Sequence, residues 1–578
     1  MSSEKPTKGT DRPGGGRLEA WRPRAATAVV WYLRLAALLN LLGAVVTPFR
    51  AQVTRHNTGE YFTPYLITAG FTSAVVAAFL AVMMRRRKRA AWIANVVLVA
   101  LYLATVVLVL TAYGEVREHP SDWVSAAISA LLLVALLIGR REFHAKGDRS
   151  NPRLALAVLV GGGIVGMLVG TVLVALTDRT HDSTVWNQMN YALLRVYTLA
   201  PAGKEYHGVL PPHWVDVVIN VMSVAILLLV LYVLFRAPKG TEYLCPEDEE
   251  RLRALLDRHG DRDSLGYFAL RRDKSVIFSP SGKAAVAYRV ASGVSLASAD
   301  PVGDVEAWPG AIDRWLAQAE EHGWIPAVIG AGEEGGTVYA RHGLNALELG
   351  DEAVVEVADF SLDGRAMRGV RQAHKRVQRA GYTVRIRRHE DIPREEMEEL
   401  VALADRWRDG QTERGFSMAL GRLGDPSDGR CVMVECMDGD GERRALLSFV
   451  PWGREGLSLD LMRRDRDSDN GLIEYMVLEL IAHGEEFGVR RISLNFAMFR
   501  AVFERGGKLG AGPVLRLWRE VLLFFSRWWQ IESLYRANAK YRPIWEPRYL
   551  LFSRTADLPR IGLAAARAEG FLSLPWHR

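Results

Sequence analysis

Long apolar runs fill the first 239 residues, whereas apolar and polar positions alternate over short distances in the remainder. A helix needs roughly 20 apolar residues to cross a bilayer, and most of these runs approach or exceed that length. The pattern predicts six membrane-spanning helices, the fourth being the shortest, followed by a globular half. The apolar runs lie at about 27–47, 62–84, 90–113, 123–139, 154–176 and 215–235.

Basic residues gather in the N-terminal tail, in RRRKR at 85–89 and in GRREFHAKGDR at 139–149. Because Lys and Arg concentrate in cytoplasmic loops, these three segments are expected to lie inside. An even number of spans then returns the chain to the cytoplasm after Arg236. The sequence therefore predicts a multi-pass protein of the cell (plasma) membrane whose N-terminus and soluble half are cytoplasmic. The first run lacks a convincing cleavage site, which favours a retained anchor.

The formal net charge of +7 comes from the membrane half. Residues 1–239 hold 25 Lys and Arg against 13 Asp and Glu, whereas the rest holds 48 against 53. Topology signals explain this excess, so any nucleic-acid site must be a local patch. Only three cysteines occur, without metal-ligand spacing. They are interpreted as buried residues of a reduced compartment, and no metal site is expected.

The soluble half contains the same order of elements twice. In the second copy, strands from Val432, at ALLSFV and at LSLDLM (457–462) are separated by glycine-containing turns, and a helix at about 471–487 precedes strand RRISLNF. Earlier, SVIF, AAVAYRV, SGVSLAS, a helix at about 308–322 and WIPAVIG repeat this β-β-β-α-β order. A helical crossover normally makes its flanking strands parallel.

This order is typical of Gcn5-related acyltransferases, which admit an acyl donor between the two strands that flank the crossover helix. We therefore predict an α-helical membrane domain followed by an α+β cytosolic domain with a tandem Gcn5-related acyltransferase-like fold. Ahead of the crossover helix, RRDRDSDNG offers three aspartates in place of a glycine-rich pyrophosphate loop, so coenzyme A is disfavoured. The predicted parts are a disordered basic tail (1–24), the transmembrane domain (25–239), two repeats (240–370 and 371–556) and a C-terminal tail (557–578).

Nine Lys or Arg and no acidic residue lie between Arg365 and Arg388. At 100° per residue most of them fall on one face of a helix that ends near Gly381, with Val370 and Val377 away from that face. A solvated face is the simpler interpretation. The absence of acidic residues favours a phosphate-binding surface for RNA or anionic lipid. The basic stripe comprises Arg365, Arg368, Arg371, Lys375, Arg376 and Arg379.

Polar side chains follow the two strands at the predicted opening. Asp460 alternates with Leu459 and Leu461, so it should point to the opposite face of the sheet. Arg463 and Arg464 follow at the strand's end. A carboxylate there could bind an amino group or assist proton transfer, although pairing of Asp460 with a neighbouring Arg explains the residue equally well. Asn495, after the crossover helix, is a second polar candidate.

An aromatic-rich helix is predicted at 514–538, with Trp518, Phe524, Phe525, Trp528 and Trp529. Most such stripes belong to a core, and a membrane-surface contact is the alternative.

Near the end of the chain, AKYRPIWEPRYLLF at 539–552 combines basic and aromatic residues. Together with LDLMRRD and with SLNFAMFR at 493–500, the longer stretch SLYRANAKYRPIWEPRYL at 533–550 resembles the C-terminal domain of the lysylphosphatidylglycerol synthases, or multiple peptide resistance factors. The resemblance runs from about 245 to 555. It implies transfer of an aminoacyl group, usually lysyl, from aminoacyl-tRNA to phosphatidylglycerol, which would yield a cationic lipid and antimicrobial peptide resistance.

The resemblance implies that the reaction needs no cofactor, because aminoacyl-tRNA is the co-substrate. It also implies roles for individual residues. A separate aminoacyl-tRNA synthetase is the expected supplier, and homo-oligomerisation is an open possibility. Lipid flipping is not carried over, because larger relatives have more spans. The candidate catalytic residues are Asp460, Arg463, Arg464 and Glu546. The candidate substrate-binding residues are Asn495, Lys540, Arg542, Trp545, Arg548, Arg368, Lys375 and Arg379.

Rival hypotheses stay open. A membrane transporter or flippase could carry a cytosolic domain that only regulates it. An aminoacyltransferase of the same fold could use a different acceptor, and the domain could have lost its activity.

Overall fold

The computed structural model describes ten ranges of the chain, and it forms two compact units, almost wholly residues 1–238 and 239–578. Each unit is described by itself. The described ranges are 16–45, 71–85, 87–112, 120–143, 151–178, 183–198, 209–234, 243–408, 415–498 and 537–572.

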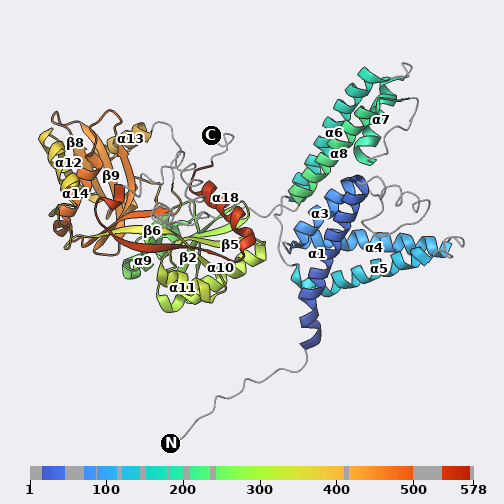
Figure 1. The fold of residues 1–578 in the computed structure, drawn as a ribbon, viewed down its shortest axis with the longest axis horizontal. Helices are drawn as coiled ribbons and strands as arrows, with labels where there is room; N and C mark the ends of the chain where they lie inside the picture. The colour runs from blue at the N-terminus through green and yellow to red at the C-terminus, as the bar shows by residue number, and fades with distance from the viewer. Residues whose placement is uncertain are drawn as a thin grey trace, which may run out of the picture. The chain divides into compact units, whose positions relative to one another are not determined.

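The described part of the first unit is helical (Figure 1). Six apolar helices among the described residues overlap the six predicted runs, and a more polar helix, α7 (Val185–Thr198), was not expected from the sequence. The apolar helices are α1 (Gly16–Val45), α3 (Phe71–Arg85), α4 (Arg89–Ala112), α5 (Pro120–Ile138), α6 (Asn151–Thr177) and α8 (His213–Leu234).

Four described stretches are long and apolar enough to cross a membrane: Trp21–Leu42, Arg89–Leu108, Arg153–Thr177 and His213–Leu234. The described parts of α3 and α5 have 15 and 19 residues. The structure therefore supports a membrane domain, whereas the count of six spans stays a prediction.

Glycines allow α6 to pack closely against its neighbours. A Cβ atom at Gly162 would lie 3.1 Å from Ile226 of α8, and one at Gly170 would lie 3.0 Å from Ala192 of α7. Beside this contact, the buried carboxylate of Asp216 accepts a hydrogen bond from Tyr191 Oη at 2.6 Å and pairs with Arg195 Nε at 3.2 Å. Small residues permit close approach of apolar helices, and the buried pair joins α7 to α8.

The second unit contains one twelve-stranded sheet and its helices. The strands are β1 (Ser275–Phe278), β2 (Ala284–Ala291), β3 (Val294–Ser298), β4 (Val302–Gly303), β5 (Ile325–Ala331), β6 (Asn345–Glu356), β7 (Thr383–Arg388), β8 (Val432–Met437), β9 (Arg443–Trp452), β10 (Gly456–Arg464), β11 (Arg491–Met498) and β12 (Ile544–Phe552). The α-helices are α9 (Pro246–His259), α10 (Trp308–His322), α11 (Glu333–Arg341), α12 (Arg368–Arg379), α13 (Arg394–Arg408), α14 (Leu472–Ala482) and α18 (Leu558–Ala568).

The predicted β-β-β-α-β order occurs twice, as β1-β2-β3-α10-β5 and as β8-β9-β10-α14-β11. In both copies the strands that flank the crossover helix are parallel. Figure 1 shows α12 and α14 beside β8 and β9 of the second copy, and α18 beside β5 of the first. The fold class therefore agrees with the sequence prediction.

The two repeats exchange their last strands. The sheet order β1-β2-β3-β5-β12-β6-β11-β10-β9-β8-β7 places β12 next to β5, and β6 next to β11. Leu550 of β12 pairs with Ile329, and Ile492 of β11 pairs with Val355. Each repeat is thus completed by a strand from the other, so the predicted boundary at residues 370 and 371 does not separate two closed sheets.

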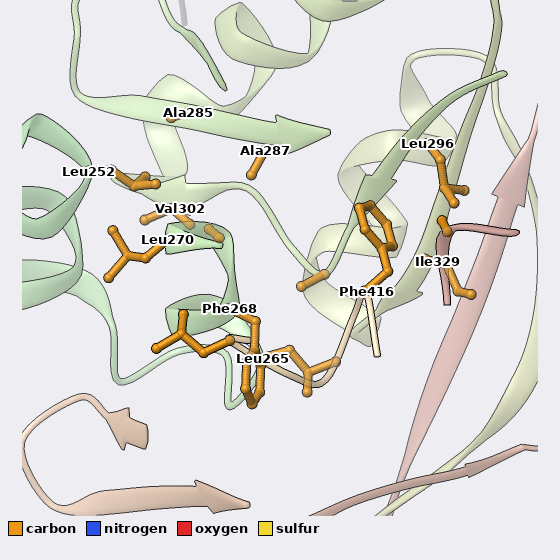
Figure 2. Close-up of a cluster of buried hydrophobic side chains, with 14 of the residues drawn as sticks. Leu252, Leu265, Phe268, Leu270, Ala285, Ala287, Leu296, Val302, Ile329 and Phe416 are labelled. Carbon is orange, nitrogen blue, oxygen red and sulfur yellow. The ribbon is translucent and has the colours of Figure 1, made fainter. Parts of the chain in front are cut away.

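Two large apolar cores lie in this unit. One gathers side chains of β2, β3, β5 and β12 with Phe268 from the 3-10 helix Gly266–Leu270 and Phe416 from a loop (Figure 2). The other packs α12 and α14 on β8 to β11, with Val377, Met476 and Leu447 among its members. Burial of these side chains supplies the main stabilisation of each half.

Residues 557–578, expected to form a tail, begin with a folded helix. Helix α18 buries Ile561, Ala564 and Ala568 against the first core. Arg560 donates to Ser292 O at 2.7 Å and 2.9 Å, which fixes the helix to the turn between β2 and β3. The apolar residues of this helix recur at helical spacing, a signal that the sequence prediction missed.

Lys274 is fully buried beside the first core. Its Nζ donates to Phe268 O at 2.9 Å and to Ser298 Oγ at 2.7 Å, and it lies 4.6 Å from the ring centre of Phe416. Burial, followed by the charge of Arg271, lowers the pKa of Lys274 from 10.5 to about 7. The unfolded chain therefore binds more protons than the native chain between these pH values.

Lys274→Met is expected to remove the free-energy cost of burying this lysine, and that cost depends on pH. In the wild type this cost is fully present below about pH 7 and fades as pH rises toward 10.5. The unfolding free energy of the variant relative to wild type should fall by on the order of 2–4 kcal/mol between pH 7 and 10. Urea unfolding of the detergent-solubilised full chain at several pH values measures this difference. A difference independent of pH would contradict the expectation.

Candidate functional site

An opening separates β10 from β11 in the second repeat. These parallel strands pair only from Gly456 with Arg491 to Ser458 with Ser493. Farther along, β10 pairs with β9 alone and β11 with β6 alone. The corresponding strands of the first repeat, β3 and β5, stay paired over five residues. The opening predicted between the strands that flank the crossover helix is therefore present in the second repeat.

A bulge at Asp460 lies where the two strands part. Leu459 pairs with Phe449 and Leu461 with Ser448, which leaves Asp460 without an opposite residue. Bulges bend a strand and redirect the side chain they carry. Asp460 Oδ1 accepts a hydrogen bond from Leu420 N at 2.6 Å, whereas Leu459 packs against the second core. Asp460 thus points to the face opposite Leu459, as predicted, but the bulge interrupts the alternation, and Leu461, which pairs with Ser448, does not lie on the same face as Leu459.

Two asparagines bond to strand backbone at the narrow end of the opening, and one of them, Asn495, joins β11 to β10. Asn495 has φ of +65°, a conformation that Asn tolerates better than most residues, and its Nδ2 donates to Leu459 O at 2.6 Å. Asn538 Nδ2 donates to Leu494 O at 3.1 Å. The Oδ1 of Asn495 is buried and accepts no hydrogen bond from the residues that the structure describes. This oxygen is an acceptor on the side chain that bonds to Leu459, the residue before Asp460.

Cationic side chains lie at the mouth of the opening, beside the first turn of α14. Lys540 Nζ pairs with Glu474 Oε1 at 2.5 Å. Burial alone would raise the pKa of Glu474, but the hydrogen bond from Lys540 and the charges of Lys540 and Arg464 lower it. Arg464 and Lys540 therefore share one acidic neighbour. Arg463 is partly exposed on the same strand end, and its Nη1 donates to Met462 O at 3.0 Å.

The residues at the start of β12 make other contacts. Arg542 is exposed with φ of +52°, and Trp545 packs against the second core. Glu546 pairs in register with Glu352 of β6. Glu546 is exposed to solvent, and partial desolvation, followed by the negative charge of Glu352, raises its pKa. A carboxyl with a raised pKa can hold and release a proton, but no contact joins Glu546 to the opening among the residues described.

Arg548 is buried, not exposed to phosphates as the sequence suggested. The side chain is 4% exposed, and its guanidinium pairs with Glu352 and, at 2.8 Å, with Asp263. It also donates to Ser264 Oγ at 2.8 Å and to Gly330 O at 3.2 Å. Within this cluster the same guanidinium links β12, β6 and the segment before β1. The geometry gives Arg548 a structural role at the strand exchange.

The buried cluster around Arg548 continues toward α11 and touches the closed end of the opening. Ser493 of β11 donates to Glu352, and Ser458 of β10 donates to Ser264 O at 2.7 Å. Asp300 accepts from Gly332 N at 2.7 Å. Burial, followed by the charge of Asp263, raises the pKa of Asp300 to about 7. One arginine thus faces three acidic side chains, one of which takes up a proton near neutral pH.

The predicted basic helix is present as α12. Its apolar residues Val370 and Val377 are buried, whereas Arg368, Lys375 and Arg379 are exposed, as the helical pattern predicted. Two further basic residues of the stripe serve the fold. Arg371 donates to backbone oxygens of Leu362 and Gly364, and Arg376 donates to Asn470 O at 2.9 Å. Arg365 precedes the helix.

Sequence reasoning missed several residues of the site. Glu474, Asn538 and Leu420 reach the opening from three separate segments. The acidic partners of Arg548 carried a weak signal, because Glu352 interrupts an apolar strand. The aromatic residues Trp518, Phe524, Phe525, Trp528 and Trp529 lie outside the described residues. Among the described residues, no group of three or more His, Cys, Asp or Glu is placed to hold a metal ion.

Comparisons with known proteins match both units. Residues 253–552 match the family model for the C-terminal part of phosphatidylglycerol lysyltransferase, and residues 20–235 match the transmembrane region of lysyl-tRNA synthetase. The described helices and this second match make the chain a membrane protein.

Full-length relatives extend this similarity. The chain is 46% identical over 574 residues to the lysylphosphatidylglycerol biosynthesis bifunctional protein LysX of Rhodococcus jostii, covering 99% of this chain and 51% of the relative. It is 47% identical over 564 residues to the protein of the same name from Mycobacterium avium, covering 96% and 47%. The chain thus spans about half the length of these relatives.

A solved structure supports the fold of the soluble unit. The structure of L-PGS from Bacillus licheniformis aligns with a TM-score of 0.50 and 24% identity, over 58% of this chain and 99% of that chain. The family model matches residues 253–552, and the identity to relatives extends along nearly the whole chain. The protein therefore belongs to the phosphatidylglycerol lysyltransferase family.

Proposed function

We propose that the protein is a membrane aminoacyltransferase that moves a lysyl group from lysyl-tRNA to phosphatidylglycerol. The observation that carries the proposal is the opening between β10 and β11, with Asp460 and Asn495 at its narrow end and Arg464 and Lys540 at its mouth. The names of the LysX relatives support the product class. A cationic lipid would lower the attraction of cationic peptides to the membrane surface.

The proposed reaction is a transesterification. A glycerol hydroxyl oxygen of the lipid attacks the lysyl carbonyl carbon, the bond from that carbon to the ribose oxygen breaks, and the hydroxyl proton passes to the ribose oxygen. Atoms and charge balance without a cofactor. Positioning and charge stabilisation can supply most of the acceleration, because the donor is already an activated ester.

The residues at the opening suit the parts of this reaction. The carboxylate of Asp460 can bind the ammonium group of the lysyl moiety or assist proton transfer. The Oδ1 of Asn495 can accept a hydrogen bond from the same moiety. Arg464, Lys540 and Arg463 at the mouth can pair with the terminal phosphates of tRNA. Trp545 and Arg542 stay candidates for contacts with the tRNA end, and Glu546 for proton transfer.

Helix α12 leads to this mouth. The Arg376 side chain lies 3.3 Å from the position that a Cβ atom of Gly471 would take, so the C-terminal end of α12 adjoins the N-terminus of α14. Arg368, Lys375 and Arg379 extend along about 16 Å of exposed surface from this point. This length fits a few successive phosphates. We propose that α12 holds the RNA backbone while the aminoacyl end enters the opening.

Neutralising Arg368, Lys375 and Arg379 with glutamine is expected to raise KM for lysyl-tRNA about 10- to 100-fold at physiological salt, with kcat little changed. The slope of log binding constant against log salt concentration should become shallower by about 2 to 3, because three phosphate contacts disappear. Filter binding and steady-state kinetics across salt concentrations measure both effects. An unchanged salt slope would contradict RNA binding by α12.

The matched control replaces three exposed arginines elsewhere. Arg258, Arg454 and Arg490 line a cleft of about 560 Å³ at the paired end of β10 and β11, away from the mouth. Their replacement by glutamine removes the same charge. It is expected to leave the KM for lysyl-tRNA within about twofold, because Coulomb interactions beyond a Debye length are screened.

Location and partners complete the proposal. The basic segments at 85–89 and 139–149 support a cytoplasmic position for the N-terminus and the soluble unit at the plasma membrane. Lysyl-tRNA would come from an aminoacyl-tRNA synthetase, on a separate chain or elsewhere in a longer one. Homo-oligomerisation is left to a direct measurement of the oligomeric state.

Reconstitution tests the function directly. The full chain in vesicles that contain phosphatidylglycerol is mixed with tRNA charged with labelled lysine, and the lipids are analysed by mass spectrometry. The expected product is a headgroup heavier by one lysyl residue. Vesicles without phosphatidylglycerol and tRNA charged with another amino acid are the controls. Absence of an aminoacyl lipid, with labelled lipid still moving between leaflets, would favour the transporter hypothesis.

A further inference from the structure

A short buried loop, Gly415–Leu420, holds the carboxylate of Asp460. Phe416 and Ser417 are fully buried, and Leu420 is 4% exposed. The backbone N–H of Leu420 donates to Asp460 Oδ1 at 2.6 Å, which fixes one carboxylate oxygen at the bulge of β10. The orientation of Asp460 therefore depends on where this loop is held.

Glu569, directly after α18, binds the other end of the loop. Its carboxylate accepts from Phe416 N at 2.6 Å, from Ser417 N at 3.1 Å and from Ser417 Oγ at 2.6 Å, and its backbone oxygen accepts from Gly415 N at 3.1 Å. The residue is 4% exposed. Hydrogen bonds to a buried carboxylate are strong because the acceptor is charged, so several of them hold a loop without regular structure in one position.

Two basic side chains hold the loop from the first repeat. Arg271 Nη1 donates to Gly415 O and, at 3.0 Å, to Ala419 O, while its Nε pairs with Asp273 at 2.7 Å. Lys274 lies under the ring of Phe416. Figure 2 shows Phe416 among side chains of the first core, including Leu296 and Ile329. The loop thus joins α18 and the first repeat to the opening in the second.

We propose that Glu569 is a positioning residue for the transfer reaction, acting on Asp460 through the loop Gly415–Leu420. The inference rests on the proposed function. Glu569 lies beyond residues 253–552, the range that matches the family model. The segment after β12 therefore contributes to the site through a chain of hydrogen bonds, although it lies outside that range.

A double-mutant cycle between Glu569→Gln and Asp460→Asn tests the proposal in the full chain. The single variant E569Q is expected to lower kcat about 10- to 100-fold, because glutamine cannot accept at both oxygens and the loop shifts. KM for lysyl-tRNA should stay unchanged, since the contacts on α12 remain. When Asp460 is already replaced by asparagine, adding E569Q should lower kcat by less than about a further twofold. Such non-additivity is expected of residues that act as one unit.

The control is Glu435→Gln, the same change at a fully buried carboxylate of β8 that pairs with Arg387 and Arg443. Any fall in kcat that E435Q causes by destabilising the fold should multiply the fall in kcat caused by D460N. If E569Q multiplies in the same way, Glu569 is only structural and the proposal fails. Ser417→Ala, which removes one hydrogen bond to Glu569, gives a milder version if E569Q does not fold.

Amide hydrogen exchange separates this inference from the proposed function. E569Q is expected to speed exchange across 415–420 at least about tenfold, whereas E435Q should leave it unchanged. A wild type that makes no aminoacyl lipid overturns the proposed function and, with it, the role of Glu569. An active wild type whose E569Q variant keeps full kcat or unchanged exchange overturns the positioning role alone.

Discussion

Asp460→Asn is expected to lower kcat/KM for lysyl transfer about 10²- to 10⁴-fold, the range found for loss of a group that assists proton transfer or binds developing charge. The asparagine oxygen can still accept from Leu420 N, so the loop should stay in place and the effect should report the lost charge. Labelled lysine in extracted lipid measures the rate. Thermal unfolding of the variant should match that of wild type.

Asp467→Asn supplies the control for this prediction. Asp467 is exposed in the turn between β10 and α14, and it carries the same charge a few residues away. Its replacement should leave the transfer rate within about twofold, because exposed charges are screened. Retention of the wild-type rate by D460N would remove Asp460 from the reaction and leave Asn495 as the main polar candidate at the opening.

Arg548→Met is expected to cause the largest loss of stability, about 3–5 kcal/mol, because it leaves buried carboxylates without their counter-charge. Glu352 and Asp263 both pair with this guanidinium. Arg542→Met, at an exposed residue of the same segment, should cost less than about 0.5 kcal/mol. Denaturant unfolding of the full chain in detergent measures both variants. Similar losses in the two would contradict the structural role of Arg548.

The loss in R548M should also depend on pH. A carboxyl whose pKa is raised in the native chain binds more protons there than in the unfolded chain, so its contribution is present at low pH and is lost as pH rises through the native pKa. Asp300 already titrates at about 7 in the wild type, from an ordinary value of 3.8. The deficit of R548M should therefore be smaller at pH 5 than at pH 8. A larger deficit at pH 5 would show that the carboxyls are not the cause.

Local patterns in the sequence predict much of the fold. The apolar residues Leu459 and Leu461 give the strand, although the bulge at Asp460 interrupts the expected alternation, and the strand order gives the opening between β10 and β11. Helical spacing of Val370 and Val377 gives the exposed basic face of α12. These features depend on residues close together in the chain, where side-chain periodicity decides which face is buried.

Distant contacts explain what the sequence did not predict. Arg548 lies in a stretch rich in basic and aromatic residues, which suggests an exposed phosphate site. Its partners Asp263 and Glu352 come from other parts of the chain, and only the exchange of β6 and β12 brings them together. The helix α7 was missed because its polar residues hide the apolar face that packs on α6.

The exchanged strands also affect how the chain is made. During synthesis β5 emerges early, but its neighbour β12 follows only after the whole second repeat has been translated. Until then the first half exposes an unpaired edge on a nascent chain held at the membrane, and such edges invite wrong pairing. Completion of the domain therefore waits for the translation of residues 544–552. A ribosome that stalls before residues 544–552 would leave both halves unfinished.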